Sequence, residues 1–317
     1  MPDLTKTETA DAPDQAAEVT AAEPRNGAGA VGKPRSLWGD AWRDLRRRPL
    51  FIIGSLLIVL MLVVAAWPGL FTSADPGSGD LANHFLQSPN LTHFFQPDWF
   101  GYDGQGRSIY ARVVYGTRNS LLVGFGVTIT ITLFGGLMGM LAGYFGGFWD
   151  SLISRLTDVF FGIPFLLGAM VVLNSVDQIT VPVVIGALAF LGWTQITRVM
   201  RGAVITNKHA DYVTAARALG AGTKRILLKH ILPNAMAPVI VIATIALGTY
   251  IVAESTLAYL GLGLNGISWG SDINDATQNI RNNPHVLFFP AGMLSLTVLA
   301  FIMLGDAVRE ALDPKLR

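Results

Sequence analysis

The residue types that most often do chemistry are few and scattered in this chain. Cysteine is absent and the five histidines are spread over predicted loops and helix ends, which excludes disulfides, thiolate metal sites and a cysteine nucleophile. The sequence contains neither a GxxxxGK[ST] phosphate-binding loop nor an HExxH zinc motif, and no Ser–His–Asp arrangement rises above chance. We therefore expect no enzyme activity, no metal site and no cofactor in this chain.

One motif matches a cofactor-binding pattern by its letters alone. Residues 261–266, GLGLNG, read GxGxxG, but a dinucleotide site needs that motif between a strand and a helix. Here it follows an uncharged stretch long enough to be a membrane helix. We interpret the match as a coincidence.

Glu254 is the ionisable residue that stands out, because it ends an uncharged run that starts at Ile231. A charged side chain deep in a bilayer costs about 2.5–3.5 kcal/mol on insertion scales, so we expect this carboxylate to face a cavity or a partner. Two interpretations are open. Glu254 is either a pathway or gate residue that meets the cargo or its amine, or a structural residue that snorkels or hydrogen-bonds to a neighbouring helix.

Composition places the chain in a membrane. It has 317 residues, of which 51% are hydrophobic and 14% are charged, and its mean hydropathy is +0.45. Ordinary soluble domains carry about 25% charged residues. The net charge of +1 leaves no dense basic face, so nucleic acid is not an expected partner. The first apolar run begins near residue 49, too deep for a signal peptide, and is expected to be a retained anchor.

Hydropathy predicts an all-α integral membrane protein with about six spans. Residues 1–35 lack large apolar side chains, and we expect a disordered cytoplasmic tail. Residues 36–74 form an amphipathic lead-in and the first span, residues 75–117 an external loop, and residues 118–317 the transmembrane core. A bilayer core of about 30 Å takes about 20 helical residues. The expected spans are residues 49–74, 119–149, 159–176, 179–197, 234–259 and 286–305.

The distribution of lysine and arginine orients these spans. In the lead-in, Leu37, Trp38, Trp42 and Leu45 can lie on the membrane interface beside a cluster of arginines at residues 43–48, which places the N-terminus in the cytoplasm. Six spans return the C-terminus to the same side. Basic residues gather at the expected cytoplasmic ends, and those outside or at the outer boundary are Arg107, Arg112, Arg118 and Arg281.

Glycines of the second expected span permit close contact between helices. Gly135 and Gly139 form a GxxxG pair, which we expect to serve packing within the chain rather than a dimer. The other small positions are Gly124, Gly126, Gly136 and Gly143.

Between the fourth and fifth expected spans lies a cytoplasmic segment that is charged and helical in pattern. Asp211 is a predicted N-cap, and a glycine at residue 220 is where a C′ residue would end the helix. Tyr212, Ala215, Ala216 and Leu219 fall at i, i+3, i+4 and i+7 and form one face.

A second short helix is expected to follow that glycine. Thr223 is its predicted N-cap, and Pro233 is predicted to stop it. Two short helices joined at glycines beside a membrane are suited to docking into another protein.

This segment closely resembles the "EAA" loop of ABC importer permeases, with Thr214 where the motif usually has glutamate. In that family the loop is the coupling helix that inserts into a cleft on the ATP-hydrolysing subunit. The resemblance implies a coupling loop over residues 203–233. The implied coupling residues are Asp211, Tyr212, Thr214, Ala215, Ala216, Arg217, Leu219, Gly220, Ile231, Leu232 and Pro233.

Three further segments resemble signatures of the same family, at residues 100–107, 143–150 and 306–314. The resemblance as a whole covers about residues 36 to 317, in separate signatures at the family's order and spacing. It identifies the chain as similar to the C-type permease of the oligopeptide, dipeptide and nickel importers. The resemblance implies a type I permease architecture in a bacterial plasma membrane. It also implies a pathway or gate at the outer end of span five, formed by Glu254, Ser255, Gly261 and Gly263.

The resemblance implies ATP-driven import of di- or oligopeptides by alternating access. The implied partners are a second permease subunit, two ATP-binding subunits that carry ATP and Mg²⁺, and an external substrate-binding protein. Nickel chelates or haem are alternative cargoes of the same class. An ATP-independent secondary transporter or channel, which would show inverted repeats and broken helices, and a membrane anchor for a signalling assembly are the alternatives from other classes.

Overall fold

The computed structural model describes residue 39, residues 42–43 and residues 45–312. The predicted tail at residues 1–35, the interface residues Leu37 and Trp38, and the last residues of the C-terminal signature lie outside this range. In the described part, the β-structure consists of two isolated β-bridges, Gly79–Arg107 and Tyr102–Ser108. The predicted all-α class is confirmed.

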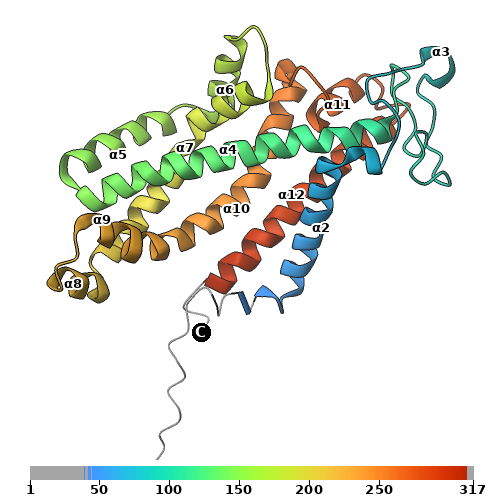
Figure 1. Cartoon of the computed structure of the whole chain (residues 1–317). Coiled ribbons are helices and arrows are strands. Elements are labelled where there is room, and N and C mark those ends of the chain that lie inside the picture. Colours follow the sequence, from blue (N-terminus) through green and yellow to red (C-terminus); the bar gives the residue numbers. More distant parts are fainter. Residues whose placement is uncertain (1–38, 40–41, 44, 313–317) are drawn as a thin grey trace, which may run out of the picture. The chain divides into compact units, whose positions relative to one another are not determined.

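Long apolar helices make up most of the described chain (Figure 1). Five elements are long and apolar enough to cross a membrane, and a sixth crossing results if the bent pair of α5 and α6 counts as one span. The long helices are α2 (Pro49–Ala66), α4 (Ile109–Phe145), α5 (Gly147–Phe161), α6 (Phe165–Asn174), α7 (Val181–Lys208), α10 (Leu232–Leu257) and α12 (His285–Leu312). The short ones are η1 (Pro68–Leu70), α3 (Leu81–His84), α8 (Asp211–Ala218), α9 (Thr223–Arg225), η2 (Ile226–Ile231), η3 (Ala258–Leu262) and α11 (Trp269–Ala276).

Two predicted boundaries near the first loop were wrong. The helix α4 begins at Ile109 rather than at residue 119, so the last residues of the predicted external loop 75–117 are helical. Ser108 caps this helix by accepting a hydrogen bond from the Ala111 N–H at 3.2 Å. The helix α2 ends at Ala66 rather than at residue 74, because the proline at residue 68 cannot continue its hydrogen-bond ladder.

The third predicted span, residues 159–176, is broken in the structure. Its first residues belong to α5 and its last to α6, and the two helices meet at an angle of 84°. The break contains Ile163 and Pro164, and a residue before proline is disfavoured in the helical region. The fourth and fifth predicted spans are longer than expected, at Val181–Lys208 and Thr223–Leu262.

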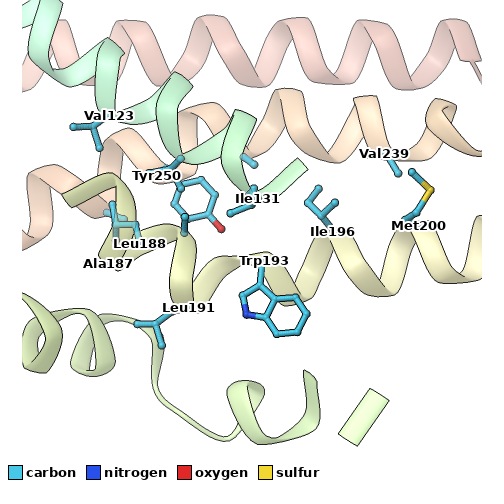
Figure 2. Close-up of a cluster of buried hydrophobic side chains, with 14 of the residues drawn as sticks. Val123, Ile131, Ala187, Leu188, Leu191, Trp193, Ile196, Met200, Val239 and Tyr250 are labelled. Atoms are coloured by element: carbon cyan, nitrogen blue, oxygen red, sulfur yellow. The ribbon is translucent and has the colours of Figure 1, made fainter. Parts of the chain in front are cut away.

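The main apolar core lies between α4, α7 and α10, and Figure 2 shows side chains from these helices meeting there. Fully buried members include Val127, Leu188 and Ile196. Tyr250 reaches from α10 toward α7 in the same cluster. This core positions the helices that carry the features described below.

Glycines on α4 explain how closely α7 approaches it. A β-carbon at Gly135 would lie 2.5 Å from the carbonyl oxygen of Trp193, and one at Gly143 would lie 2.8 Å from that of Arg201. Gly139, between them, faces the carbonyl of Thr197 in the same way. The GxxxG pair therefore serves packing within the chain, as predicted.

The helix α2 packs against α12, with a second apolar cluster between them and α4. Leu45, which precedes α2, is buried against Ala307 and Ala311 of α12. Its predicted place on the membrane interface was therefore wrong, because α12 extends seven residues beyond the predicted end at residue 305 and covers it. Trp42 is exposed, and the Arg46 guanidinium lies 4.6 Å from its ring centroid.

Candidate coupling loop and transport cavity

The segment predicted to be cytoplasmic begins with α8, whose predicted N-cap was wrong by one residue. The N-cap position is Ala210, with extended backbone and no side-chain cap, and Asp211 is the first helical residue. Its carboxylate still lies in the first turn, where a negative charge is favourable at the positive end of the helix. Thr223 shows the same displacement, because Gly222 is the N-cap of α9.

The end of α8 matches the predicted glycine cap. Gly220 has φ +80°, and its N–H donates to the Arg217 carbonyl at 2.9 Å. The Ala221 N–H donates to the Ala216 carbonyl at 3.0 Å. This is the double hydrogen bond of a Schellman motif, so the prediction for residue 220 is confirmed.

The face predicted from periodicity lies mostly on the outside of α8. Tyr212, Ala215 and Leu219 are exposed, with Leu219 89% exposed, and of the predicted set only Ala216 is buried. The buried side consists of Val213 and Ala216, spaced i and i+3. That spacing was visible in the sequence, but the longer Tyr212–Leu219 series obscured it. Thr214 and Arg217 are also exposed.

Tyr212 ties α8 to both neighbouring long helices. Its hydroxyl donates to Asn207 Oδ1 of α7 at 2.6 Å and accepts from Asn234 Nδ2 of α10 at 3.3 Å. Burial raises the pKa of this phenol above its ordinary value, and the bond from Asn234 opposes that effect. The segment is therefore fixed to the ends of two long helices.

The second half of the segment continues into the membrane. Pro233 was predicted to stop a helix, and that prediction was wrong. It lies in the first turn of α10, where the missing N–H is tolerated. Ile231 is fully buried and Leu232 is half-buried. Residues Thr223–Leu262 therefore form one continuous element of 40 residues, which connects the cytoplasmic segment to the outer end of α10.

The four predicted pathway residues lie at that outer end and differ in burial. Glu254 and Ser255 are buried, and α11 covers them, since a β-carbon at Gly270 would lie 2.6 Å from the Ser255 Cα. Gly261 has φ +87° and is exposed, and Gly263 is half-buried. The GxGxxG match begins inside η3, directly after α10, and no strand precedes it among the described residues, which agrees with its interpretation as a coincidence.

A cavity of 410 Å³ lies instead at the bend between α5 and α6. Its walls are the bend itself and the middle parts of α7 and α10. The wall is apolar and aromatic except for Thr194, Gln195, Thr249 and Tyr250, and it carries no charged side chain. The sequence interpretation missed this cavity, although an uncharged polar residue in the middle of an apolar run, such as Gln195, was a visible signal.

The polar groups of this cavity differ in how they are satisfied. The Tyr250 hydroxyl donates to the Gly192 carbonyl at 3.4 Å, and the Thr249 hydroxyl donates to the Ile245 carbonyl at 3.3 Å. The Gln195 side chain is exposed and makes no hydrogen bond to any residue that the structure describes. Its carboxamide is free to contact a ligand.

Two protein-family models match this chain. Residues 135–317 match the family described as "Binding-protein-dependent transport system inner membrane component", and residues 36–89 match "N-terminal TM domain of oligopeptide transport permease C".

Three relatives are similar over nearly the whole chain. The oligopeptide transport system permease protein OppC of Bacillus subtilis (strain 168) is 36% identical over 287 residues, which cover 90% of this chain and 92% of that protein. The dipeptide transport system permease protein DppC of the same strain is 39% identical over 281 residues, covering 88% and 86%. The glutathione transport system permease protein GsiD of Escherichia coli O157:H7 is 36% identical over 285 residues, covering 89% and 92%.

These matches confirm the predicted family, the membrane location and the absence of a catalytic role in this subunit. The two alternatives from other classes, an ATP-independent transporter and a signalling anchor, are therefore set aside. A component of a binding-protein-dependent system works with a binding protein and an ATPase. The chain belongs to the binding-protein-dependent transport system inner membrane components, as a multi-pass permease subunit of the OppC/DppC type found in peptide ABC importers.

Proposed function

We propose that this subunit imports short peptides, from dipeptides to oligopeptides and including glutathione, by alternating access. The relatives named above are permeases for oligopeptides, dipeptides and glutathione, and these cargoes share a peptide backbone. Cargo arrives on an external binding protein and passes between this subunit and a second permease. Two ATP-binding subunits supply the energy.

The observation that carries the proposal is the outward face of α8. Leu219 is a large apolar side chain that is 89% exposed at the cytoplasmic end of the chain, and Tyr212 fixes the same helix to α7 and α10. An exposed apolar side chain on a rigidly held helix is suited to docking in a cleft of a partner. The ATPase transmits a conformational change only if this docking differs between its nucleotide states.

The proposal is tested by isolating the tagged chain from its native membranes in mild detergent and identifying the copurified proteins by mass. We expect two ATP-binding subunits and a second permease. The purified complex is reconstituted into liposomes together with its binding protein. It should take up a dipeptide, a tetrapeptide or glutathione only when ATP is present on the side of the membrane that carries the ATP-binding subunits. Recovery of the chain alone, with ATP-independent uptake, would contradict the proposal.

The Gly220→Val variant tests the coupling loop. A β-carbon at residue 220 meets no atom within 4 Å, so its effect comes from the backbone at φ +80° rather than from a clash. A left-handed residue other than glycine costs about 1–2 kcal/mol, and a branched side chain is least tolerated there. We expect ATP-dependent uptake to fall roughly tenfold, in line with that energy.

Gly220→Asn is the matched control, because asparagine also occurs at this helix-capping position. We expect it to retain most of the uptake and all of the ATPase association. Equal uptake by the two variants would show that the conformation at residue 220 does not matter for coupling.

A further inference from the structure

We infer that the cavity at the bend between α5 and α6 is this subunit's part of the cargo pathway, and that the Gln195 carboxamide contacts the peptide backbone of the cargo there. The inference rests on the proposed function and adds the location and the contact residue. It moves the contact with cargo from the predicted outer end of α10 to the cavity between the bend, α7 and α10.

The position of Gln195 is the first argument. The residue lies in the last turn of the apolar part of α7, one turn before Arg198, and α7 is long and apolar enough to span the membrane. An amide transferred to an apolar environment without a hydrogen bond costs roughly 2–7 kcal/mol, yet this one is exposed and unpaired among the described residues. A polar partner, either water or cargo, must therefore reach this carboxamide, because lipid tails form no hydrogen bonds.

The break in the membrane helix is the second argument. Gly162, Ile163 and Pro164 are exposed at the bend, and two of them line the cavity. Non-helical backbone at membrane depth is tolerated only where protein buries it or where it lines a water-filled space. Since the described residues do not bury this bend, the cavity beside it is expected to be wet.

The chemistry of the wall indicates the class of ligand. A carboxamide both donates and accepts hydrogen bonds, which matches the N–H and C=O groups of a peptide unit. The wall carries no charged side chain to select an ionised cargo group, and its volume of 410 Å³ lies within the usual range for ligand pockets, about 300–1,000 Å³. Such a wall accepts a peptide backbone and tolerates different side chains.

The natural absence of cysteine in this chain permits a direct test by thiol labelling. The Gln195→Cys and Leu56→Cys variants are each assembled with the ATPases and the second permease in nanodiscs. They are then treated with a charged thiol reagent, and labelling of this chain is followed by mass. Leu56 is the control, because it is 68% exposed on the apolar helix α2 and is not among the residues that line the cavity.

We expect the Gln195→Cys variant to be labelled at least roughly tenfold faster than the Leu56→Cys variant, because only the thiolate in contact with water reacts quickly. We also expect trialanine to protect the Gln195→Cys variant in the nucleotide state that admits cargo. Labelling no faster than that of the control, in both the nucleotide-free and the ATP-analogue state, would overturn the inference. So would a disulfide or contact that joins residue 195 permanently to the second permease.

Uptake gives the second readout. We expect Gln195→Leu to lower trialanine uptake roughly fivefold, the effect of one lost hydrogen bond, with the amount of assembled complex unchanged. Thr130→Val is the matched polar-to-apolar control, since its hydroxyl only bonds the Gly126 carbonyl within α4. Equal uptake by both variants would overturn the cavity assignment and leave the proposed function standing, whereas absence of trialanine uptake by the wild-type complex would contradict the proposed function itself.

Discussion

At the scale of single residues, Glu254 shows how burial changes the interpretation of a charged group in a membrane helix. Its side chain is 2% exposed. Its Oε2 accepts a hydrogen bond from the Ser255 hydroxyl at 3.3 Å, and its Oε1 is buried without a partner among the described residues. This geometry supports the structural alternative over direct contact with cargo, because α11 packs over the neighbouring Ser255.

The two roles are separated by Glu254→Gln. Glutamine keeps the size of the side chain and one acceptor oxygen but removes the charge, so we expect the variant to retain at least about half of the wild-type uptake, since a neutral hydrogen bond still forms. Glu254→Leu removes the acceptor and should reduce the yield of assembled complex. Full assembly with abolished uptake in the glutamine variant would instead favour a charge-dependent role, such as contact with a cargo amine.

At the scale of elements, the contact between α4 and α7 depends on a row of glycines. Gly139 faces the Thr197 carbonyl, and a β-carbon added to this glycine would also lie 2.8 Å from Met200 Cβ. These are backbone and near-backbone atoms, which cannot move aside without separating the helices. Overpacking of this kind typically costs about 1–3 kcal/mol.

We therefore expect Gly139→Leu to lower the thermal stability of the purified complex and to reduce its expression. Gly136→Ala is the control on the same helix, because the nearest atom to its added β-carbon is the flexible Met200 Cε at 3.6 Å. Thermal unfolding in detergent measures both. Similar stability of the two variants would show that the glycine row does not determine the distance between α4 and α7.

At the scale of the whole described chain, two segments about 160 residues apart in sequence meet beside the main apolar core between α4, α7 and α10. Arg112 Nε of α4 donates to Asp272 Oδ1 of α11 at 2.7 Å, and both side chains are buried. The Trp269 indole N–H donates to the Val113 carbonyl at 3.0 Å. These bonds hold α11 against the start of α4, near the end of α4 opposite α8 and α9 (Figure 1).

A more exposed ion-pair network lies beside this contact. Arg107 Nε donates to Asp103 Oδ2 at 2.6 Å, and Arg107 Nη2 donates to Asp275 Oδ2 at 3.0 Å. Burial alone would lower the pKa of the Arg107 guanidinium, but the two carboxylates raise it above its ordinary value. The Asp275 side chain is 43% exposed, so its pair is expected to add little stability.

Asp272→Asn is expected to destabilise the complex by about 3–5 kcal/mol, because it leaves a buried guanidinium without its counter-charge. The double variant Arg112→Met with Asp272→Leu should recover much of that loss, since an apolar pair avoids the desolvation of both charges. Asp275→Asn is the exposed control and should cost about 0–1 kcal/mol. The midpoint of thermal unfolding, measured for all three, would contradict this account if Asp272→Asn and Asp275→Asn behaved alike.

Local patterns along the chain were sufficient to predict the membrane class, the approximate number of spans and the end of α8 at Gly220. Each of these depends on nearby residues: an uncharged run of about 20 residues, the side on which arginines gather, or a glycine where a helix must end. The capping positions of α8 and α9 were wrong by one residue, at Asp211 and Thr223. Several side chains can cap a helix, and the backbone conformation just before it decides which position does so.

The location of the cavity and the pairing of charges, in contrast, depend on how the helices pack. The 84° bend between α5 and α6 brings residues near 163 against Gln195 and Thr249 of two other helices, and no periodicity within one helix contains that arrangement. The burial of Glu254 and the pairing of Arg112 with Asp272 depend on the position of α11. The groups that form the cavity and the ion pair are far apart in sequence and meet only after the helices have packed. Their contacts therefore cannot be read from any one stretch of the chain.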